Sequence, residues 1–403
     1  MANGNKSAIA KRLDGVSESA TLKLNALVQA MRARGEDVIN LTAGEPDFAP
    51  PEAAKAAIRK ALDENRNKYT PVGGLPELRE RVAKKTNAQQ PEVVSRFGEW
   101  KGSDVVVSNG GKQAIYNVMM SLLNPGDEVI IPAPYWLSYP EMVKLAEGVP
   151  VFIQSREDRK FKIGVDELRA AVTPKTKILI LNSPSNPTGS TYTKGEFEAI
   201  GAYLVKEAPH VWVISDEIYD RILFQDGKFH SFLDAAPELR NRAVTVNGLS
   251  KSAAMTGWRI GWTVAPPELT SAILTLQGQS TSGINSLAQY AGVAALDLPE
   301  DSFTEMVSAF KRRRRIALEI LAKAAKLKVF PPEGAFYVFL GIEAFLKEGE
   351  DAMQLSETLI REAKVAVVPG GPFGAPLWVR MSIAMDDETL KKGCERLVSF
   401  FTR

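Results

Sequence analysis

The chain alternates between short apolar runs and helical stretches from residue 105 to residue 266. Runs rich in Val, Ile and Leu predict strands at 105–108, 128–132, 151–153, 177–182, 211–215, 243–246 and 262–265. Apolar residues at helical spacing fill several of the intervals, at 112–122, 140–146, 165–172 and 194–205. Strands that alternate with helices form mostly parallel sheets, and near-continuous apolar runs are typical of strands covered on both faces. We therefore predict an α/β fold with a mostly parallel, doubly wound sheet of seven strands.

The segments on either side follow different patterns. Before the alternation, the sequence predicts a short strand at 38–41 and helices at 17–35 and 52–63. After it, a long helix is expected around 301–325, with short strands at 329–330, 336–339 and 379–382. The regular alternation does not continue there. We predict a large domain over 50–295 and a smaller α+β domain built from 1–49 and 296–403.

Composition narrows the possible partners and compartments. The net charge of +2, with 45% hydrophobic residues, is ordinary for a soluble globular protein and does not suggest a nucleic-acid or membrane partner. The single cysteine, Cys394, excludes an intrachain disulfide and fits a reducing, cytoplasmic location. The sequence shows no signal peptide at 1–10, no apolar run of membrane-spanning length and no metal-ligand cluster. The basic run at 311–315 is expected on the solvated face of a helix.

Polar or reactive groups follow four of the predicted strands. They are Gly110, Gly111 and Lys112 after the first strand, Asn182 to Asn186 after the fourth, Asp216 and Tyr219 after the fifth, and Lys251 after the sixth. Ligands of open α/β sheets bind beyond the carboxyl ends of the strands, so these placements together predict a site. Two glycines before a helix also let the backbone approach an anion, which the helix N-terminus favours.

Lys251 lies in a turn of small residues, NGLSKSAAMTG, where a solvated surface charge would be poorly placed. Low-dielectric surroundings would lower the pKa of its amine and free it for carbonyl chemistry. Arg259 follows eight positions later and keeps its charge, which suits a permanent anion such as a phosphate. A Schiff-base lysine beside a phosphate-binding arginine is what pyridoxal phosphate requires.

This stretch resembles the lysine signature of the class I aminotransferases, which are fold-type-I pyridoxal-phosphate enzymes. The signature has a small, an apolar and a small residue before the lysine, then Arg eight positions later, an apolar residue and Gly. Three further stretches resemble the same family and occur in the same order: GEPDF from Gly44, the loop Tyr69–Arg79, and NPTG from Asn186. The closest resemblance is to the bacterial aspartate and aspartate/prephenate aminotransferases. It implies a large cofactor-binding domain and a smaller one.

The resemblance also implies how pyridoxal phosphate is held. Lys251 carries the cofactor and moves a proton, Asp216 faces the pyridine nitrogen, and Tyr219 and Asn186 reach the phenolic oxygen; Trp136 stacks on the ring. The phosphate is expected on Gly110, Gly111, Lys112, Ser250 and Arg259. Two of these residues have a plain structural alternative, since Asp216 could cap a helix and Trp136 could be core packing. Gly248 stands where the family often has a phosphate-binding serine.

Tyr69 resembles the tyrosine that reaches the neighbouring subunit's cofactor phosphate. If the match holds, the active site needs a homodimer.

Substrate residues follow from the same resemblance. Arg380, inside an apolar run, is expected to grip the α-carboxylate, with a structural salt bridge as the alternative. Gly44 would meet the same carboxylate through its backbone, and Trp136 and Asn186 would also contact the substrate. One branch of the family binds a distal carboxylate with an arginine, which the stretch 278–283 (GQSTSG) lacks. Lys112, Ser19 and Thr21 fit another, bacterial branch, whose members act on aspartate and in some cases prephenate.

We therefore predict an aminotransferase that moves the amino group of aspartate, or of another dicarboxylic amino acid such as glutamate, to 2-oxoglutarate by a ping-pong mechanism. An aminotransferase for aromatic or neutral amino acids is the first alternative, and a carbon–sulfur lyase of the same fold is the second. A non-catalytic ligand sensor is a third reading. Regulators of that kind carry an added DNA-binding segment, and residues 1–50 are too short for one and show no basic recognition helix.

Overall fold

The computed structural model describes residues 9–13, 15–17, 20–224 and 229–403. Its largest sheet has seven strands in the order β2-β8-β7-β6-β5-β3-β4, which confirms the predicted architecture. The five strands from β7 to β4 in this order run parallel to one another. β8 is antiparallel to both of its neighbours, β2 and β7. The strands are β2 (Val105–Asn109), β3 (Glu128–Ala133), β4 (Val149–Gln154), β5 (Thr176–Asn182), β6 (Trp212–Asp216), β7 (Ala243–Gly248) and β8 (Ile260–Val264).

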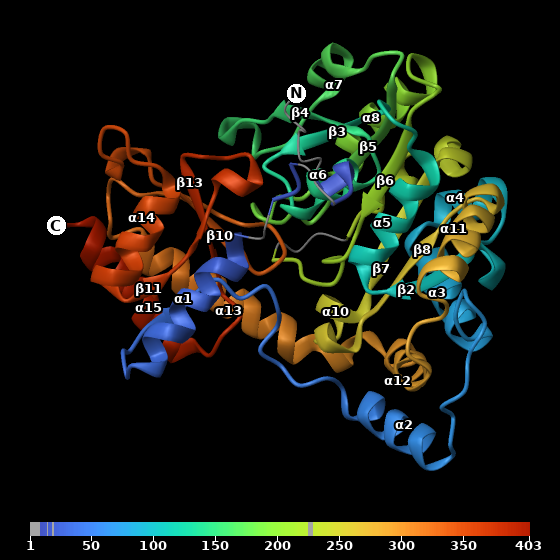
Figure 1. Ribbon diagram of the computed structural model, residues 1–403, viewed down its shortest axis with the longest axis horizontal. Helices are drawn as coiled ribbons and strands as arrows, with labels where there is room; N and C mark the ends of the chain where they lie inside the picture. The colour runs from blue at the N-terminus through green and yellow to red at the C-terminus, as the bar shows by residue number, and fades with distance from the viewer. Residues whose placement is uncertain (1–8, 14, 18–19, 225–228) are drawn as a thin grey trace, which may run out of the picture.

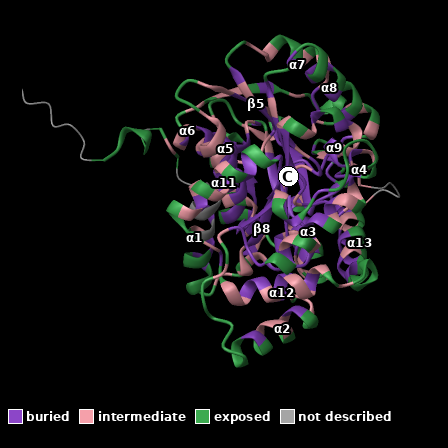
Figure 2. Cartoon of the chain, turned by 90° about the vertical axis from the view of Figure 1, so that its right-hand side faces the viewer, coloured by how far each residue is buried: buried purple, intermediate pink, exposed green. Residues whose placement is uncertain are grey.

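Helices cover both faces of this sheet. Successive side chains of a strand point to opposite faces, so Leu179 joins one apolar cluster and Ile180 the other. The helices that contribute buried residues to the first cluster include α3 (Pro76–Gln89), α8 (Lys194–Lys206) and α12 (Ser286–Leu296). Those of the second include α5 (Gly111–Leu122), α6 (Ser138–Leu145) and α11 (Pro267–Ser280). Figure 2 shows the strands buried at the centre of the molecule and the outer faces of the helices exposed.

Further elements extend this region. α7 (Val165–Ala171) follows β4, and α4 (Pro91–Phe97), which follows the end of α3, packs against α9 (Phe232–Ala235). α2 (Glu52–Asp63) packs on α12 at the lower edge of Figure 1. The helix α4 was not predicted, because its seven residues are too few to show a clear helical period.

A second region combines the C-terminal third of the chain with the N-terminal arm. An antiparallel sheet joins β9 (Lys328–Phe330), β10 (Tyr337–Gly341), β12 (Val368–Pro369) and β13 (Trp378–Ser382). The arm enters through β1 (Ile39–Asn40), which pairs with β11 (Val365–Ala366). In Figure 1 the blue α1 (Ala20–Ala33) lies beside the red and orange elements. The remaining helices are α13 (Thr304–Leu321), α14 (Ala352–Thr358) and α15 (Asp387–Phe401). The boundaries drawn at 50 and 295 stay predictions.

The expectation for the basic run at 311–315 is wrong for one residue. These residues lie on α13, but Arg313 is only 5% exposed. Its guanidinium pairs with Asp47 and Asp387, which come from segments far away in the sequence. A buried arginine needs such partners, and a local pattern of charges does not show them.

Candidate active site

A cavity of about 320 Å³ opens at the carboxyl ends of the large-sheet strands. We call it the pocket. Eleven of the residues singled out from the sequence line it: Gly44, Gly111, Lys112, Trp136, Asn186, Asp216, Tyr219, Ser250, Lys251, Arg259 and Arg380. Most of them come from loops that follow parallel strands, and such ends share one edge of a sheet. Gly44 and Arg380 come from the second region and close the other side.

Lys251 reaches the pocket because β7 ends at Gly248 and gives way to a single helical turn, α10 (Leu249–Ser252). Its Nζ donates a hydrogen bond to the carbonyl oxygen of Gly44. Burial lowers the pKa of this amine from 10.5 to about 8, and Glu45 acts in the opposite direction. Because a buried ammonium loses solvation, a larger fraction of the amine is neutral near physiological pH than in an exposed lysine.

Cations surround the N-terminus of α5. Gly110, with a φ of +81°, is the N-cap residue just before this helix, and a Cβ there would lie 2.6 Å from Nη2 of Arg259. Gly261, opposite Ser108 in the sheet, leaves room for the backbone of Gly111 in the same way. The glycines therefore let Arg259 and the start of the helix come together. A helix N-terminus flanked by permanent positive charge is a good anion site.

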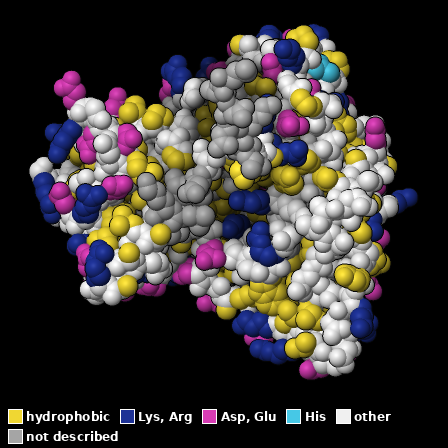
Figure 3. Space-filling model, in the orientation of Figure 1, with side chains coloured by type: hydrophobic (Ala, Val, Ile, Leu, Met, Phe, Trp, Pro, Cys, Tyr) yellow, Lys and Arg dark blue, Asp and Glu magenta, His cyan; other side chains and the backbone are white. Residues whose placement is uncertain are grey.

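Lys112 and Arg259 complete this cationic side of the pocket. Arg259 donates hydrogen bonds to the carbonyl oxygens of Asn109 (3.1 Å) and Thr256 (3.0 Å), which hold its guanidinium in place. Burial lowers the pKa of Lys112, and the charge of Arg259 lowers it further. The Lys112 amine lies 5.2 Å from the ring centroid of Trp136. In Figure 3, Lys and Arg side chains gather in the hollow near the centre of the molecule.

Asp216 ends β6 and is 5% exposed. Its carboxylate accepts hydrogen bonds from the Tyr139 hydroxyl (2.6 Å) and from the backbone N–H of Ile218 (3.2 Å). Burial raises the pKa of this carboxyl from 3.8 to about 6, although both hydrogen bonds act in the opposite direction. A turn, rather than a helix, follows Asp216, so the residue does not cap a helix.

Arg380, on β13, is 4% exposed and points into the pocket between the rings of Tyr337 and Phe373, 4.3 and 5.1 Å from their centroids. It donates hydrogen bonds to Asn186 Oδ1 (2.9 Å) and to the carbonyl oxygen of Thr42 (3.1 Å). Its Nε is buried and has no hydrogen-bond partner in the described structure. Within the described residues no carboxylate pairs with this arginine, so the structural salt bridge is not found. A buried cation with a spare donor is suited to an anionic ligand.

The sequence did not identify two tyrosines of the site. Tyr139 holds Asp216, and Tyr337 shares a hydrogen bond of 3.0 Å with Tyr219. Tyr139 directly precedes the helix predicted at 140–146 and follows the aromatic pair Tyr135 and Trp136 by three residues, and that aromatic cluster was its only signal. Tyr337 was part of a predicted strand, but its place near Arg380 depends on the pairing of β10 with β13.

Four predicted site residues are not among those that line the pocket: Gly110, Tyr69, Ser19 and Thr21. Gly110 lies directly beside it, against the Arg259 guanidinium. The side chain of Tyr69 is fully exposed and does not line the pocket. Ser19 and the side chain of Thr21 lie outside the described residues. The residues that precede Ser19 in the arm contact α6. The N–H of Ser17 donates a hydrogen bond to the Glu141 carboxylate (2.9 Å), and the Lys144 amine donates to the carbonyl oxygen of Gly15 (2.9 Å).

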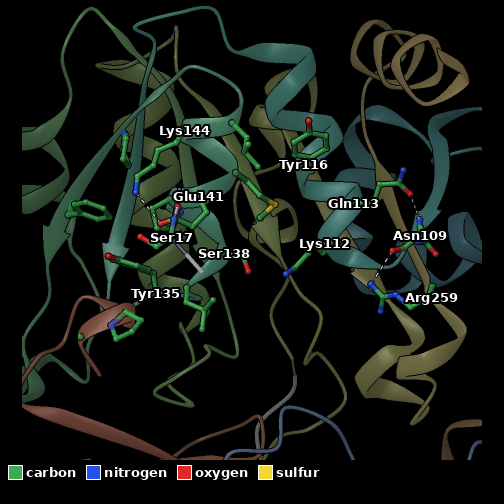
Figure 4. A pocket seen from close by; sticks show the side chains of 18 residues that line it. Ser17, Asn109, Lys112, Gln113, Tyr116, Tyr135, Ser138, Glu141, Lys144 and Arg259 are labelled. Carbon is green, nitrogen blue, oxygen red and sulfur yellow. Dashed lines mark hydrogen bonds and ion pairs between the residues drawn. The ribbon is translucent and has the colours of Figure 1, made fainter. Parts of the chain in front are cut away.

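A wider groove of about 820 Å³ adjoins the pocket, and Lys112, Ser138 and Arg259 line both. Figure 4 shows Arg259 and Asn109 at one end of this groove, Ser17, Glu141 and Lys144 at the other, and Lys112 between them. The arm therefore meets the groove across from Arg259. Among the described residues no group of His, Cys, Asp and Glu could hold a metal ion, and no helix is long and apolar enough to cross a membrane.

Comparison with known proteins gives one consistent result. Residues 36–397 match the family described as aminotransferase class I and II. The aspartate aminotransferase of Streptomyces avermitilis is 41% identical, covering 96% of this chain and 95% of its own length. A probable aspartate/prephenate aminotransferase of Aquifex aeolicus is 40% identical, covering 96% and 97%.

Solved structures agree with the sequences. The aspartate aminotransferase from Rhizobium meliloti superposes with a TM-score of 0.92 at 37% identity, covering 98% of this chain and 99% of that one. The Thermus thermophilus aspartate aminotransferase with maleate gives 0.90 at 39% identity, covering 97% and 99%. The residues that match the family include the loops that carry Lys251, Asp216 and Arg259. The chain belongs to the class I and II aminotransferases.

Proposed function

We propose that this protein is a pyridoxal-phosphate-dependent aminotransferase that takes its amino group from aspartate or another dicarboxylic amino acid and passes it to 2-oxoglutarate. One arrangement carries the proposal: a lysine with a lowered pKa faces a buried carboxylate and a buried arginine with a spare donor in the same pocket. The relatives named above are called aspartate or aspartate/prephenate aminotransferases, which supports the choice of donor.

The residues of the pocket fit pyridoxal phosphate. The N-terminus of α5, with Ser250, Lys112 and Arg259, would hold the phosphate where the glycines leave room for it. Asp216 would face the pyridine nitrogen, and Asn186 and Tyr219 would face the phenolic oxygen. When bound, the cofactor supplies an electron sink for the substrate's Cα. Trp136 would offer a ring face for stacking.

The protein's own groups would orient the substrate and move its proton. Arg380 would bind the α-carboxylate through Nε and a guanidinium Nη, with the backbone of Gly44 beside it. The Lys251 amine, with a pKa of about 8, would take the proton from the substrate's Cα and would deliver it to the C4′ carbon of the cofactor. Its hydrogen bond to the Gly44 carbonyl oxygen supports this role, because Gly44 would lie beside the substrate α-carboxylate.

Recognition of a second carboxylate is proposed for Lys112. This lysine lies where the pocket meets the groove, and the N-terminal arm crosses the far end of the same groove. Ser19 and Thr21 follow two and four residues after Ser17 in the sequence, so we infer that they complete this subsite.

A homodimer is proposed from Tyr69. A tyrosine that is 100% exposed buries none of its ring in a single chain, and such residues are favoured where a partner covers them. We infer that Tyr69 of each subunit reaches the phosphate side of the other subunit's pocket.

An absorbance spectrum before and after addition of aspartate tests the proposal. We expect a cofactor band in the visible or near-ultraviolet that shifts to that of pyridoxamine phosphate and returns with 2-oxoglutarate. A band that responds only to aromatic or neutral amino acids would keep the chemistry and overturn Lys112 as the specificity residue. Release of ammonia or a thiol instead of an oxo acid would identify a lyase.

The matched variant is Lys251→Ala, which we expect to abolish both turnover and the aspartate-dependent shift, because Lys112, the other amine among the described residues of the pocket, is assigned to binding the phosphate and the second carboxylate. Lys391→Ala, at an exposed lysine of α15, is the control and should keep both. Full activity of Lys251→Ala would contradict the proposed role.

A further inference from the structure

Arg313 joins three segments that are distant in the sequence. It lies in the middle of α13, with 6% of its side chain exposed. Nη1 and Nη2 donate to the two carboxylate oxygens of Asp47 at 2.7 and 2.8 Å, and Nε donates to Asp387 at 3.1 Å. Its guanidinium also lies 5.2 Å from the ring centroid of Phe48. A bidentate pair of this kind fixes both distance and orientation.

Asp47 and Phe48 end a loop that borders the pocket. We call residues 42–48 the pocket loop. At its start, the carbonyl oxygen of Thr42 accepts a hydrogen bond from Arg380 (3.1 Å). In its middle, the carbonyl oxygen of Gly44 accepts from Lys251, and the Glu45 carboxylate accepts from the Thr256 hydroxyl (2.8 Å). The loop therefore touches the two cationic groups that the proposed chemistry needs.

Outside the pocket, the pocket loop is held mainly at its far end. Phe48 packs edge-on against Phe310 of α13, with ring centroids 5.7 Å apart, and Asp47 binds Arg313. Gly44, Glu45 and Asp47 are exposed residues and Pro46 between them is buried, so side-chain packing restrains this part of the loop mainly at Pro46. A charge-assisted clamp on a rigid helix can add to that restraint.

We propose that Arg313 is a positioning residue: acting through Asp47, it fixes the pocket loop so that Gly44 meets Lys251 and the substrate carboxylate subsite. Arg313 does not line the pocket and touches neither Lys251 nor Arg380. Lysine could not replace it, since one ammonium cannot reproduce the two-oxygen grip on Asp47 together with the bond to Asp387. For the substrate subsite, this role rests on the proposed function.

Arg312 provides a matched comparison. It precedes Arg313 on the same helix and pairs with the same Asp387, but it does not pair with Asp47 and its side chain is 48% exposed. Replacing either arginine by methionine removes one cation from the same cluster. Only Arg313→Met releases the pocket loop.

The first experiment measures hydrogen–deuterium exchange of the full-length protein, with and without pyridoxal phosphate. In Arg313→Met we expect exchange of the amides at 42–48 to accelerate about tenfold or more, because a charge-assisted clamp is lost. Arg312→Met should change it less than about threefold. Asp47→Asn breaks the clamp from the loop side and should reproduce the effect even if Arg313→Met does not fold. Unchanged exchange at 42–48 in Asp47→Asn, or equal acceleration in Arg312→Met, would overturn the role.

The second experiment separates positioning from general stability. In the holoenzyme, Arg313→Met and Asp47→Asn should raise KM for aspartate about tenfold while kcat changes less than about threefold, because the loop aligns a binding subsite. Arg313→Lys should restore KM only in part. An equal fall of kcat in all variants, with faster exchange throughout α13 and α15, would show a merely structural residue. If the protein proves to act on another substrate class, the exchange result without cofactor still decides the role of Arg313.

Discussion

The pocket and the Arg313 cluster (Asp47, Arg312, Arg313 and Asp387) both bury cations, but they satisfy them differently. In the cluster, all three donor positions of Arg313 meet carboxylate oxygens, and the pKa of Asp387 is lowered by Arg312 and Arg313. In the pocket, Arg380 binds only uncharged oxygens and keeps a buried Nε without a partner in the described structure. Burial, rather than an ion pair, sets the pKa of Lys251.

The difference separates a structural from a functional use of charge. A buried ion that is fully paired holds segments together, whereas an incompletely paired one costs free energy in the isolated protein. Proteins accept such costs at sites where a ligand supplies the missing partner. We therefore propose that the groups of the pocket are prepared for a substrate with two carboxylates and an anionic cofactor, and that the Arg313 cluster supports the loop behind them.

The largest effect is expected from Arg380→Met. The substrate loses a buried, charge-assisted contact, which typically costs about 2–5 kcal/mol, so kcat/KM for aspartate should fall by a factor between about 30 and about 5,000. The free energy of unfolding should change by less than about 1 kcal/mol, since Met can still pack between Tyr337 and Phe373 and a cation without a carboxylate partner is removed. Steady-state kinetics and urea unfolding measure the two quantities. A large loss of stability with unchanged kcat/KM would reverse the distinction between pocket and cluster.

Glu217 shows whether a buried group with an unpaired atom is enough to identify a ligand site. It directly follows Asp216 but lies outside the pocket, accepts hydrogen bonds from Ser215 (2.9 Å) and Ser231 (2.8 Å), and has a buried Oε2 without a described partner. Burial raises the pKa of its carboxyl from 4.5 to about 7. An incompletely satisfied group is therefore not sufficient to mark a ligand site. Position at the strand ends and convergence with other groups are also needed.

The Glu217→Gln variant tests this reading by its pH dependence. A carboxyl whose folded pKa is raised contributes stability that is fully present below about pH 4.5 and is lost as the pH rises through about 7. The stability of Glu217→Gln relative to the parent protein should therefore increase by about 2–3 kcal/mol between pH 4.5 and pH 8. Urea unfolding across this range measures it. A difference that stays constant with pH would show that Glu217 does not titrate in this window.

The strands of the large sheet and most of the pocket followed from the sequence for the same reason. Apolar runs mark buried strands, and the carboxyl ends of parallel strands meet at one edge, so Lys251, Asp216 and Asn186 could be placed together without any coordinates. The direction of β8 could not be predicted in this way. An apolar run has the same composition whether the strand runs parallel or antiparallel.

Contacts between distant segments were beyond the sequence. Four consecutive arginines look alike, and nothing local distinguishes Arg313, whose partner Asp47 lies 266 positions away. Tyr139 was hidden for a related reason, because its hydroxyl meets Asp216 only after α6 has packed on the sheet. Ion pairs and hydrogen bonds of this kind depend on tertiary packing and not on a local period.

Tyr139→Phe is expected to have the smallest effect and would sharpen the account of the pocket. The Tyr139 hydroxyl stabilises the ionised form of Asp216, so its removal should raise the pKa of that carboxyl above about 6. Asp216 becomes neutral as the pH falls, so the acid limit for binding pyridoxal phosphate should move to higher pH. At pH 7 we expect about three- to tenfold weaker binding, from the loss of one hydrogen bond to a charged group.

Titration of the cofactor-free protein with pyridoxal phosphate between pH 5.5 and 8 measures this shift. Tyr116→Phe is the control, because Tyr116 lines the groove and does not contact Asp216. The pH dependence of the weakening identifies its cause. The Phe ring can still pack against Trp136, and any change in packing alone would weaken pyridoxal-phosphate binding equally at every pH. Weakening that grows as the pH falls would assign the effect to the charge of Asp216. A uniform loss would mean that Tyr139 acts in the pocket by its bulk, and that burial alone sets the pKa of its neighbour.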